Sequence, residues 1–157
     1  MALGLRRWLA LSTVAVVVAG CGSDDGATGT QCLLTTDEAA AASGLPVSSA
    51  EAWDQEASGA GPACLYTDDD GNRLNLSWRA STKADIADAR QLQAENAALF
   101  ELRDEVADGA FLGANGIPSV FVPTPTDHLI VVEMLDGLEF TEAAVGLASA
   151  AAERCCP

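Results

Sequence analysis

Cys21 offers a reactive thiol at the end of a segment with the features of an export signal. Two arginines, Arg6 and Arg7, make a short positive region near the start of the chain. An uncharged and almost wholly apolar run follows from residue 8 to residue 18, and two small residues lead into the cysteine. This pattern is typical of a secretory signal, and the apolar run is too short for a permanent membrane span.

The residues Val18-Ala19-Gly20-Cys21 resemble the lipobox of bacterial lipoproteins. In that class the cysteine thiol receives a diacylglyceryl group, and cleavage makes the cysteine the acylated first residue. The resemblance implies that residues 1–20 are removed and that Cys21 anchors the chain to the cell membrane on its extracytoplasmic face. Two or three acyl chains anchor a protein stably, since each buried methylene contributes about 0.8 kcal/mol. An ordinary secretory signal is the alternative, and the strongly apolar core favours general secretion over the twin-arginine route that Arg6-Arg7 suggest.

The chain after the signal divides into a lipidated tether, residues 21–30, and one domain, residues 31–157. The tether has no apolar residue larger than alanine after its cysteine and has a reach of about 15–20 Å. The full chain carries a net charge of −15, and loss of Arg6 and Arg7 brings the mature chain to about −17. Such a surface repels nucleic acid, so we exclude nucleic-acid binding, and it also repels anionic lipid head groups.

Local signals predict the elements of the first half of the domain. Thr35 and Glu38 have capping-box spacing, which predicts a short helix over residues 36–43. The segment 47–62 has a poor pattern, with Trp53 as a plausible buried anchor. A hairpin follows, with strands at 63–67 and 73–79 that flank an acidic turn. Leu74, Leu76 and Trp78 are expected to face the core, and Asn75, Ser77 and Arg79 to face water.

The second half of the domain alternates helix and strand. Apolar residues at helical spacing predict a long amphipathic helix over 82–108, and the segment 113–116 reads as a turn. Two strands follow at 117–122 and 128–135, the second apolar on both faces and therefore expected at the centre of a sheet. An alanine-rich helix is expected over 141–154. The predicted fold is a single α+β domain, an antiparallel sheet of four or more strands with helices packed on one face.

The domain also resembles a family. Cys32-Leu33-Leu34-Thr35 opens a short helix, Cys64-Leu65-Tyr66 begins a strand, and the run from Ala107 to Phe111 precedes a hairpin. Together with the lipobox, the tether and the alanine-rich last helix, these motifs resemble the small actinobacterial lipoproteins classed as domain of unknown function 3558. The resemblance implies a small α+β lipoprotein and supplies no mechanism. The C-terminal pair Cys155-Cys156 departs from it.

The expected compartment oxidises thiols, so the cysteines of the domain are candidates for disulfides. We predict a Cys32–Cys64 bond that ties the start of the first helix to the first strong strand. Cys155 and Cys156 are adjacent, and a vicinal disulfide, bonds to other chains and a rearranged pairing all remain open.

No motif predicts a catalytic residue, a metal ligand or a cofactor. His128 is the only histidine, and no nucleophile motif accompanies it, so a surface or strand-end role is expected. The acidic run 68–72 lacks the spacing of a calcium loop and is expected to be a solvated turn. The glycines of 113–116 lack the spacing of a phosphate-binding loop.

Three classes of function follow from these observations. The leading one is a non-catalytic, membrane-tethered extracytoplasmic domain that binds an envelope protein or a wall component. The second is a carrier for a lipid or another apolar molecule, held between the alanine-rich helix and the sheet. The third is a hydrolase with an unrecognised site. The carrier would use large side chains opposite the alanines: Trp78, Phe121, Ile130, Val132 and Met134.

Overall fold

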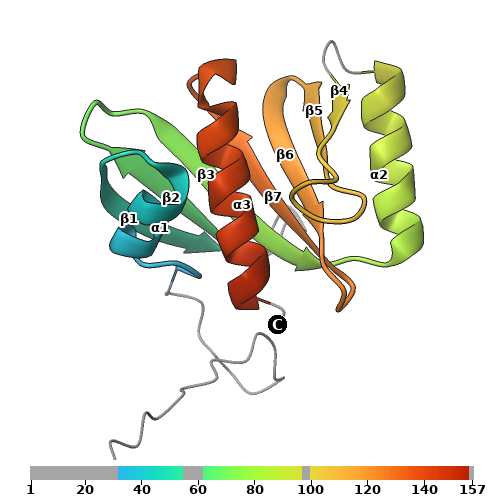
Figure 1. Cartoon of the computed structure of the whole chain (residues 1–157), viewed down its shortest axis with the longest axis horizontal. Helices are drawn as coiled ribbons and strands as arrows, with labels where there is room; N and C mark the ends of the chain where they lie inside the picture. Colours follow the sequence, from blue (N-terminus) through green and yellow to red (C-terminus); the bar gives the residue numbers. More distant parts are fainter. Residues whose placement is uncertain (1–31, 55–61, 97–99, 156–157) are drawn as a thin grey trace, which may run out of the picture.

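The structure is a computed structural model that describes residues 32–54, 62–96 and 100–155. Its elements follow one another along the chain as Figure 1 labels them. In order they are α1 (Thr36–Ser43), β1 (Val47–Asp54), β2 (Pro62–Asp68), β3 (Arg73–Ala80), α2 (Lys83–Asn96), β4 (Phe100–Leu102), β5 (Phe111–Asn115), β6 (Ile117–Pro123), β7 (His128–Met134), the short 3-10 helix η2 (Leu138–Phe140) and α3 (Thr141–Cys155). The α+β class and the single domain predicted from the sequence are confirmed.

The strands form one antiparallel sheet in the order β1-β2-β3-β7-β6-β5-β4. The apolar strand β7 lies at its centre, as its sequence predicts. Leu76 of β3 lies opposite Val132 of β7, and Val132 lies opposite Val120 of β6. Directly paired residues point to the same side, so these three side chains share one face of the sheet.

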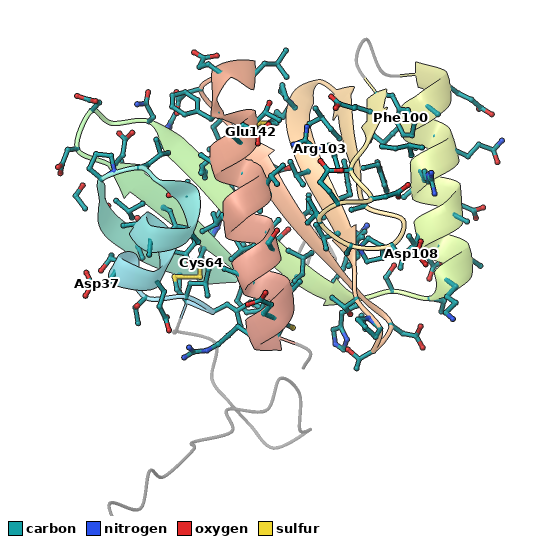
Figure 2. The ribbon with its side chains drawn as sticks, viewed as in Figure 1. Asp37, Cys64, Phe100, Arg103, Asp108 and Glu142 are labelled. Carbon is teal, nitrogen blue, oxygen red and sulfur yellow. A yellow bond between two sulfur atoms is a disulfide. The ribbon has the colours of Figure 1, made fainter. Side chains whose placement is uncertain are left out.

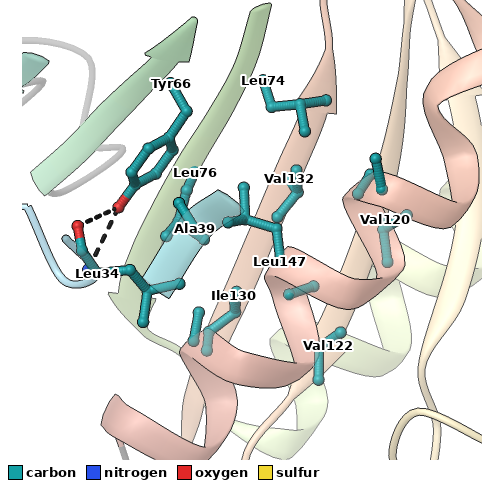
Figure 3. Packing of buried hydrophobic residues seen from close by; sticks show 14 of the residues in the cluster. Leu34, Ala39, Tyr66, Leu74, Leu76, Val120, Val122, Ile130, Val132 and Leu147 are labelled. Carbon is teal, nitrogen blue, oxygen red and sulfur yellow. Dashed lines mark hydrogen bonds between the residues drawn. The ribbon is translucent and has the colours of Figure 1, made fainter. Parts of the chain in front are cut away.

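Helices α1 and α3 cover this face (Figure 1). The facing side of α3 consists mostly of small residues, among them Ala144, Ala148 and Ala151, all of them buried. Small side chains allow the helix backbone to approach the sheet closely, and the larger Leu147 of α3 belongs to the same buried cluster as Val132 of β7 (Figure 3). This layer is the hydrophobic core of the domain.

Tyr66 shows how a polar group is accommodated in the core. Its hydroxyl donates to the carbonyl oxygen of Leu34 over 2.9 Å and accepts from the Leu34 amide over 3.2 Å (Figure 3). Burial raises the pKa of the phenol to about 12. The paired hydrogen bonds hold the segment before α1 against strand β2.

Helix α2 contacts the other face of the sheet. A Cβ added at Gly113 of β5 would meet the side chain of Gln93 of α2. Gly113 lies opposite Ser119, the neighbour of the core residue Val120, and therefore points away from α3. The expected packing of helices on one face thus holds for α1 and α3, whereas α2 lies against the opposite face near the β4 edge.

Strand β1 lies in the segment 47–62, whose poor sequence pattern predicts neither a helix nor a strand. Its residues facing the core layer are Ala50 and Ala52, which contrast weakly with their polar neighbours. Trp53, expected to be buried, is 49% exposed, and its indole nitrogen donates to the Asn75 side chain over 3.2 Å. Asn75, expected to face water, is only 3% exposed because Trp53 and Glu133 flank it. Its side-chain amide donates a hydrogen bond to the carboxylate of Glu133 over 2.6 Å.

The helix predicted over 82–108 is wrong in its second half. Helix α2 ends at Asn96, and β4 begins at Phe100. Beyond β4 the chain turns, with the Arg103 amide donating to the carbonyl of Ala110 over 2.9 Å. Pairing with β5 satisfies the backbone of β4 in the sheet, so tertiary contacts override a helical spacing of apolar residues.

The predicted turn at 113–116 is also shorter than expected. Strand β5 continues to Asn115, and Gly116 alone makes the turn into β6 with a φ of +97°. The predicted first helix matches α1, whose Thr35–Glu38 capping box is present. The predicted hairpin matches β2 and β3, and the last helix extends one residue beyond the predicted end.

Candidate functional site

A groove of about 800 Å³ lies between α2 and the sheet. Four parts of the chain line it: α2, β4, the turn after β4, and the β6–β7 hairpin. The lining includes Lys83, Ile86, Arg90, Phe100, Leu102, Asp108, Gly109, Pro123 and Asp127. A groove of this size is within the range of about 300–1,000 Å³ typical of small-molecule sites.

One wall of the groove is a single side of α2. Lys83, Ile86, Arg90 and Ala94 recur at spacings of three, four and four residues, which places them on one helix face. Thr82 precedes the helix, and its hydroxyl accepts from the Asp85 amide while the Asp85 carboxylate accepts the Thr82 amide over 3.0 Å. The Asp85 carboxylate also accepts from the Thr82 hydroxyl over 2.8 Å, and this bond and the one from the Thr82 amide lower the pKa of Asp85. The bonds between the two residues fix where the wall begins.

The base of the groove is apolar. Phe100 and Leu102 of β4 point to the same side of the sheet as Phe111 of β5, because Leu102 lies opposite Phe111. The rings of Phe111 and Phe121 stack with centroids 4.6 Å apart, and Phe100 lies 6.0 Å from Phe111. Leu102 lies on the same side of the sheet as these rings and is 45% exposed. An exposed leucine beside a row of aromatic rings provides apolar area for a ligand.

The turn after β4 holds Asp108 and Gly109 at the groove (Figure 2). Arg103 fixes this turn: it is 8% exposed, and its guanidinium lies 3.3 Å from Glu101, 2.8 Å from Glu105 and 3.0 Å from Glu142 of α3. The hydrogen bond to Glu142 raises the pKa of Arg103, so the cation persists at every physiological pH. The turn is therefore tied to the main body of the domain.

Two cations of α2, Lys83 and Arg90, line the groove. Lys83 and Arg90 form no ion pair with any residue in the described ranges. By contrast, Arg73 pairs with Asp136 over 3.3 Å. Two carboxylates, Asp108 and Asp127, also line the groove. The groove thus combines an apolar base with two available cations on its helical wall.

The cysteines predicted to form a disulfide lie at another place, on the side of the sheet covered by α1. Cys32 and Cys64 form a disulfide with their Cα atoms 5.4 Å apart, and it links the segment before α1 to β2 (Figure 2). Cys155 is buried at the end of α3. Cys21 and the predicted signal and tether lie outside the described residues, as does Cys156.

His128 lies at the start of β7, where its Nδ1 is 2.9 Å from the carbonyl oxygen of Thr126. In the neutral ring this nitrogen donates to the carbonyl. Across the described residues, no group of three His, Cys, Asp or Glu side chains could hold a metal ion.

Asp68 belongs to the acidic turn between β2 and β3. Its carboxylate accepts hydrogen bonds from the side-chain amide of Asn72 and from the backbone amides of Asn72 and Asp70, and these bonds lower the pKa of Asp68. Its carboxylate therefore stabilises the turn.

The residues expected to line a carrier cavity do not meet in one space. Ile130, Val132 and Met134 belong to the packed core under α3. Phe121 points to the opposite face, where it stacks on Phe111. The predicted location of the carrier cavity is therefore wrong, because alternate residues of β6 face opposite layers. The groove beside α2 was not predicted, and its signal in the sequence is the helical spacing of Lys83, Ile86 and Arg90.

Comparisons with family models, curated proteins and solved structures gave no match. The resemblance to the domain-of-unknown-function 3558 lipoproteins therefore depends on the motifs quoted above alone. No helix in the described part of the chain has the length and apolarity that a membrane crossing requires.

Proposed function

We propose that this chain is a membrane-anchored extracytoplasmic lipoprotein whose domain is a non-catalytic binding module for a small molecule with an apolar body. The groove beside α2 carries this proposal. It is concave, it lies outside the packed core, and its base presents Phe100 and the half-exposed Leu102. Concave sites with an apolar lining and a few polar groups are the usual form of small-molecule sites.

Anchoring is proposed from the lipobox-like motif ending in Cys21. The Cys32–Cys64 disulfide is consistent with an oxidising compartment. Metabolic labelling with an alkyne fatty acid tests the anchor: the native chain is expected to be labelled and to sediment with membranes, and Cys21→Ser to be unlabelled. A labelled Cys21→Ser chain would contradict it.

Binding in the groove is tested on the complete mature chain, residues 21–157, with Cys21→Ser to remove the acyl anchor. The probe is a neutral naphthylamine fluorophore whose emission rises in apolar surroundings. Leu102→Ser removes apolar area from the groove and is expected to weaken binding at least about tenfold. Leu138→Ser is the matched control, because Leu138 has a similar exposure, 47% against 45% for Leu102, and lies in η2.

Equal binding by the two variants would place the site elsewhere and contradict the proposal. Thermal unfolding of both variants separates lost binding from lost folding, since both side chains are half-exposed and neither substitution opens a cavity in the core.

A further inference from the structure

Cations are scarce in this domain, and their placement is uneven. After the proposed loss of the signal, six of the eight Lys and Arg residues remain against 23 Asp and Glu. Arg73, Arg103 and Arg154 each form an ion pair with a described carboxylate. The other three are Arg79, Lys83 and Arg90, and two of these line the groove.

The two groove cations flank an apolar stretch of α2. Lys83 and Arg90 are seven residues apart, which is about 10 Å along a helix, and Ile86 lies between them on the same side. Long Lys and Arg side chains both reach a group placed between them. The helical wall continues beyond Arg90 with Ala94. Phe100 of β4 also lines the groove.

The groove is also lined by two carboxylates that do not belong to its helical wall. Asp108, labelled in Figure 2, lies in the turn after β4, and Asp127 lies in the β6–β7 hairpin. Neither forms an ion pair with a described residue. Asp and Glu residues are frequent in so acidic a chain and single out no site. Only three of the six cations have no ion pair with a described carboxylate, and two of these three line the groove. The cations are therefore the informative groups.

We propose that the groove binds a single-chain amphiphile with an anionic head group. Its hydrocarbon chain lies on Phe100 and Leu102, and its head group lies between Lys83 and Arg90. This inference rests on the proposed function, and it adds the charge of the ligand to it. The net charge of the domain opposes binding of an anion in general, so affinity for an anionic head depends on these two local cations.

The test displaces the naphthylamine fluorophore from the complete mature chain carrying Cys21→Ser, at low ionic strength. The competitors are dodecanoate, dodecanol and dodecylammonium, which share one chain and differ in head-group charge. Dodecanoate is expected to bind about tenfold more tightly than dodecanol, since two ion pairs at exposed positions contribute about two- to fivefold each. Dodecylammonium is expected to bind less tightly than dodecanoate.

Charge variants locate the head group. Lys83→Gln and Arg90→Gln are each expected to weaken dodecanoate binding about two- to fivefold and to leave dodecanol binding unchanged. Arg79→Gln makes the same change of net charge at a position outside the groove lining, where the guanidinium acts on the charge of Asp85, and is the matched control. Asp108→Asn is expected to tighten dodecanoate binding.

The outcomes separate the two proposals. If dodecanol binds as tightly as dodecanoate and Leu102→Ser weakens both, the anionic head group is refuted and the apolar groove stands. If Arg79→Gln weakens dodecanoate as much as Lys83→Gln, the effect is one of net charge alone and the inference is wrong. If the fluorophore does not bind, or binds equally to the native chain and to Leu102→Ser, both proposals fail. If it binds in the groove and dodecanoate does not displace it, the inference alone fails.

Discussion

Gly146 is the residue whose substitution most sharply tests the packing of α3 on α1. It lies in the middle of α3, and a Cβ added there would overlap the carbonyl oxygen of Ala42 in α1 and come within 3.0 Å of its carbonyl carbon. The contact is with backbone, so no side chain can rotate away. The two helices would have to move apart to accept even one methyl group.

The sign of the effect distinguishes packing from helix propensity. Alanine is about 1 kcal/mol more favourable than glycine inside a helix, so propensity alone predicts that Gly146→Ala stabilises the domain. Overpacking a close contact costs about 1–3 kcal/mol, and a backbone contact belongs at the upper end of that range. The net expectation is a loss of about 1–2 kcal/mol.

Guanidinium and thermal unfolding of the complete mature chain measure this loss. A loss of 1 kcal/mol corresponds to about 3–6 °C in Tm for a domain of this size. Ser149→Ala is the control in the same helix. It removes the hydrogen bond from the Ser149 hydroxyl to the carbonyl oxygen of Val145 and raises the helix propensity of the position. The two effects oppose each other, so stability is expected to change by less than about 0.5 kcal/mol. A Gly146→Ala chain as stable as the wild type, or more stable, would refute the close contact of α1 and α3.

Three further predictions concern the rest of the domain. Replacing Cys32 and Cys64 by serine opens a loop with a sequence separation of 32 residues. The chain-entropy model predicts a loss of about 3–4 kcal/mol in the free energy of unfolding, which guanidinium unfolding measures. An unchanged unfolding midpoint would contradict this prediction. The pKa of Glu38 is lowered by hydrogen bonds from Thr35 and by Arg154, so its carboxylate stabilises the fold above its unfolded pKa, and this contribution disappears as the pH falls through the lower folded value. Glu38→Gln is therefore expected to flatten the acid side of a plot of Tm against pH, and a slope like that of the wild type would refute the interpretation. Asp68→Ala removes the acceptor of the β2–β3 turn and is expected to lower Tm at neutral pH, an effect that should fade in acid.

The elements that the sequence predicts well are those with a strong local signal. The capping box of Thr35 and Glu38 marks the start of α1, and the apolar run of β7 marks a central strand. Both signals depend on residues close together in the chain. Strand β1 escaped prediction because its inward residues are alanines, and β4 because pairing with β5 overrides a helical spacing.

The groove could not be predicted for a related reason. Its base depends on the alternation of strands β4–β6 and its wall on α2, and only the folded sheet brings these segments together. The periodicity of Lys83, Ile86 and Arg90 was visible as one side of a helix. This side of α2 and Phe100 line the same groove because of the register of the sheet. Local patterns in the sequence do not reveal that register.

A native mass spectrum tests the central claim, a groove that binds a small molecule with an apolar body, most directly. The chain is extracted from its own membranes, released from its acyl anchor, and sprayed under non-reducing conditions beside Leu102→Ser and Leu138→Ser prepared in the same way. We predict an additional mass on the native chain and on Leu138→Ser that matches a small amphiphile and is absent from Leu102→Ser. A bare mass for all three chains, lower only by the hydrogens lost to disulfides, would contradict the claim.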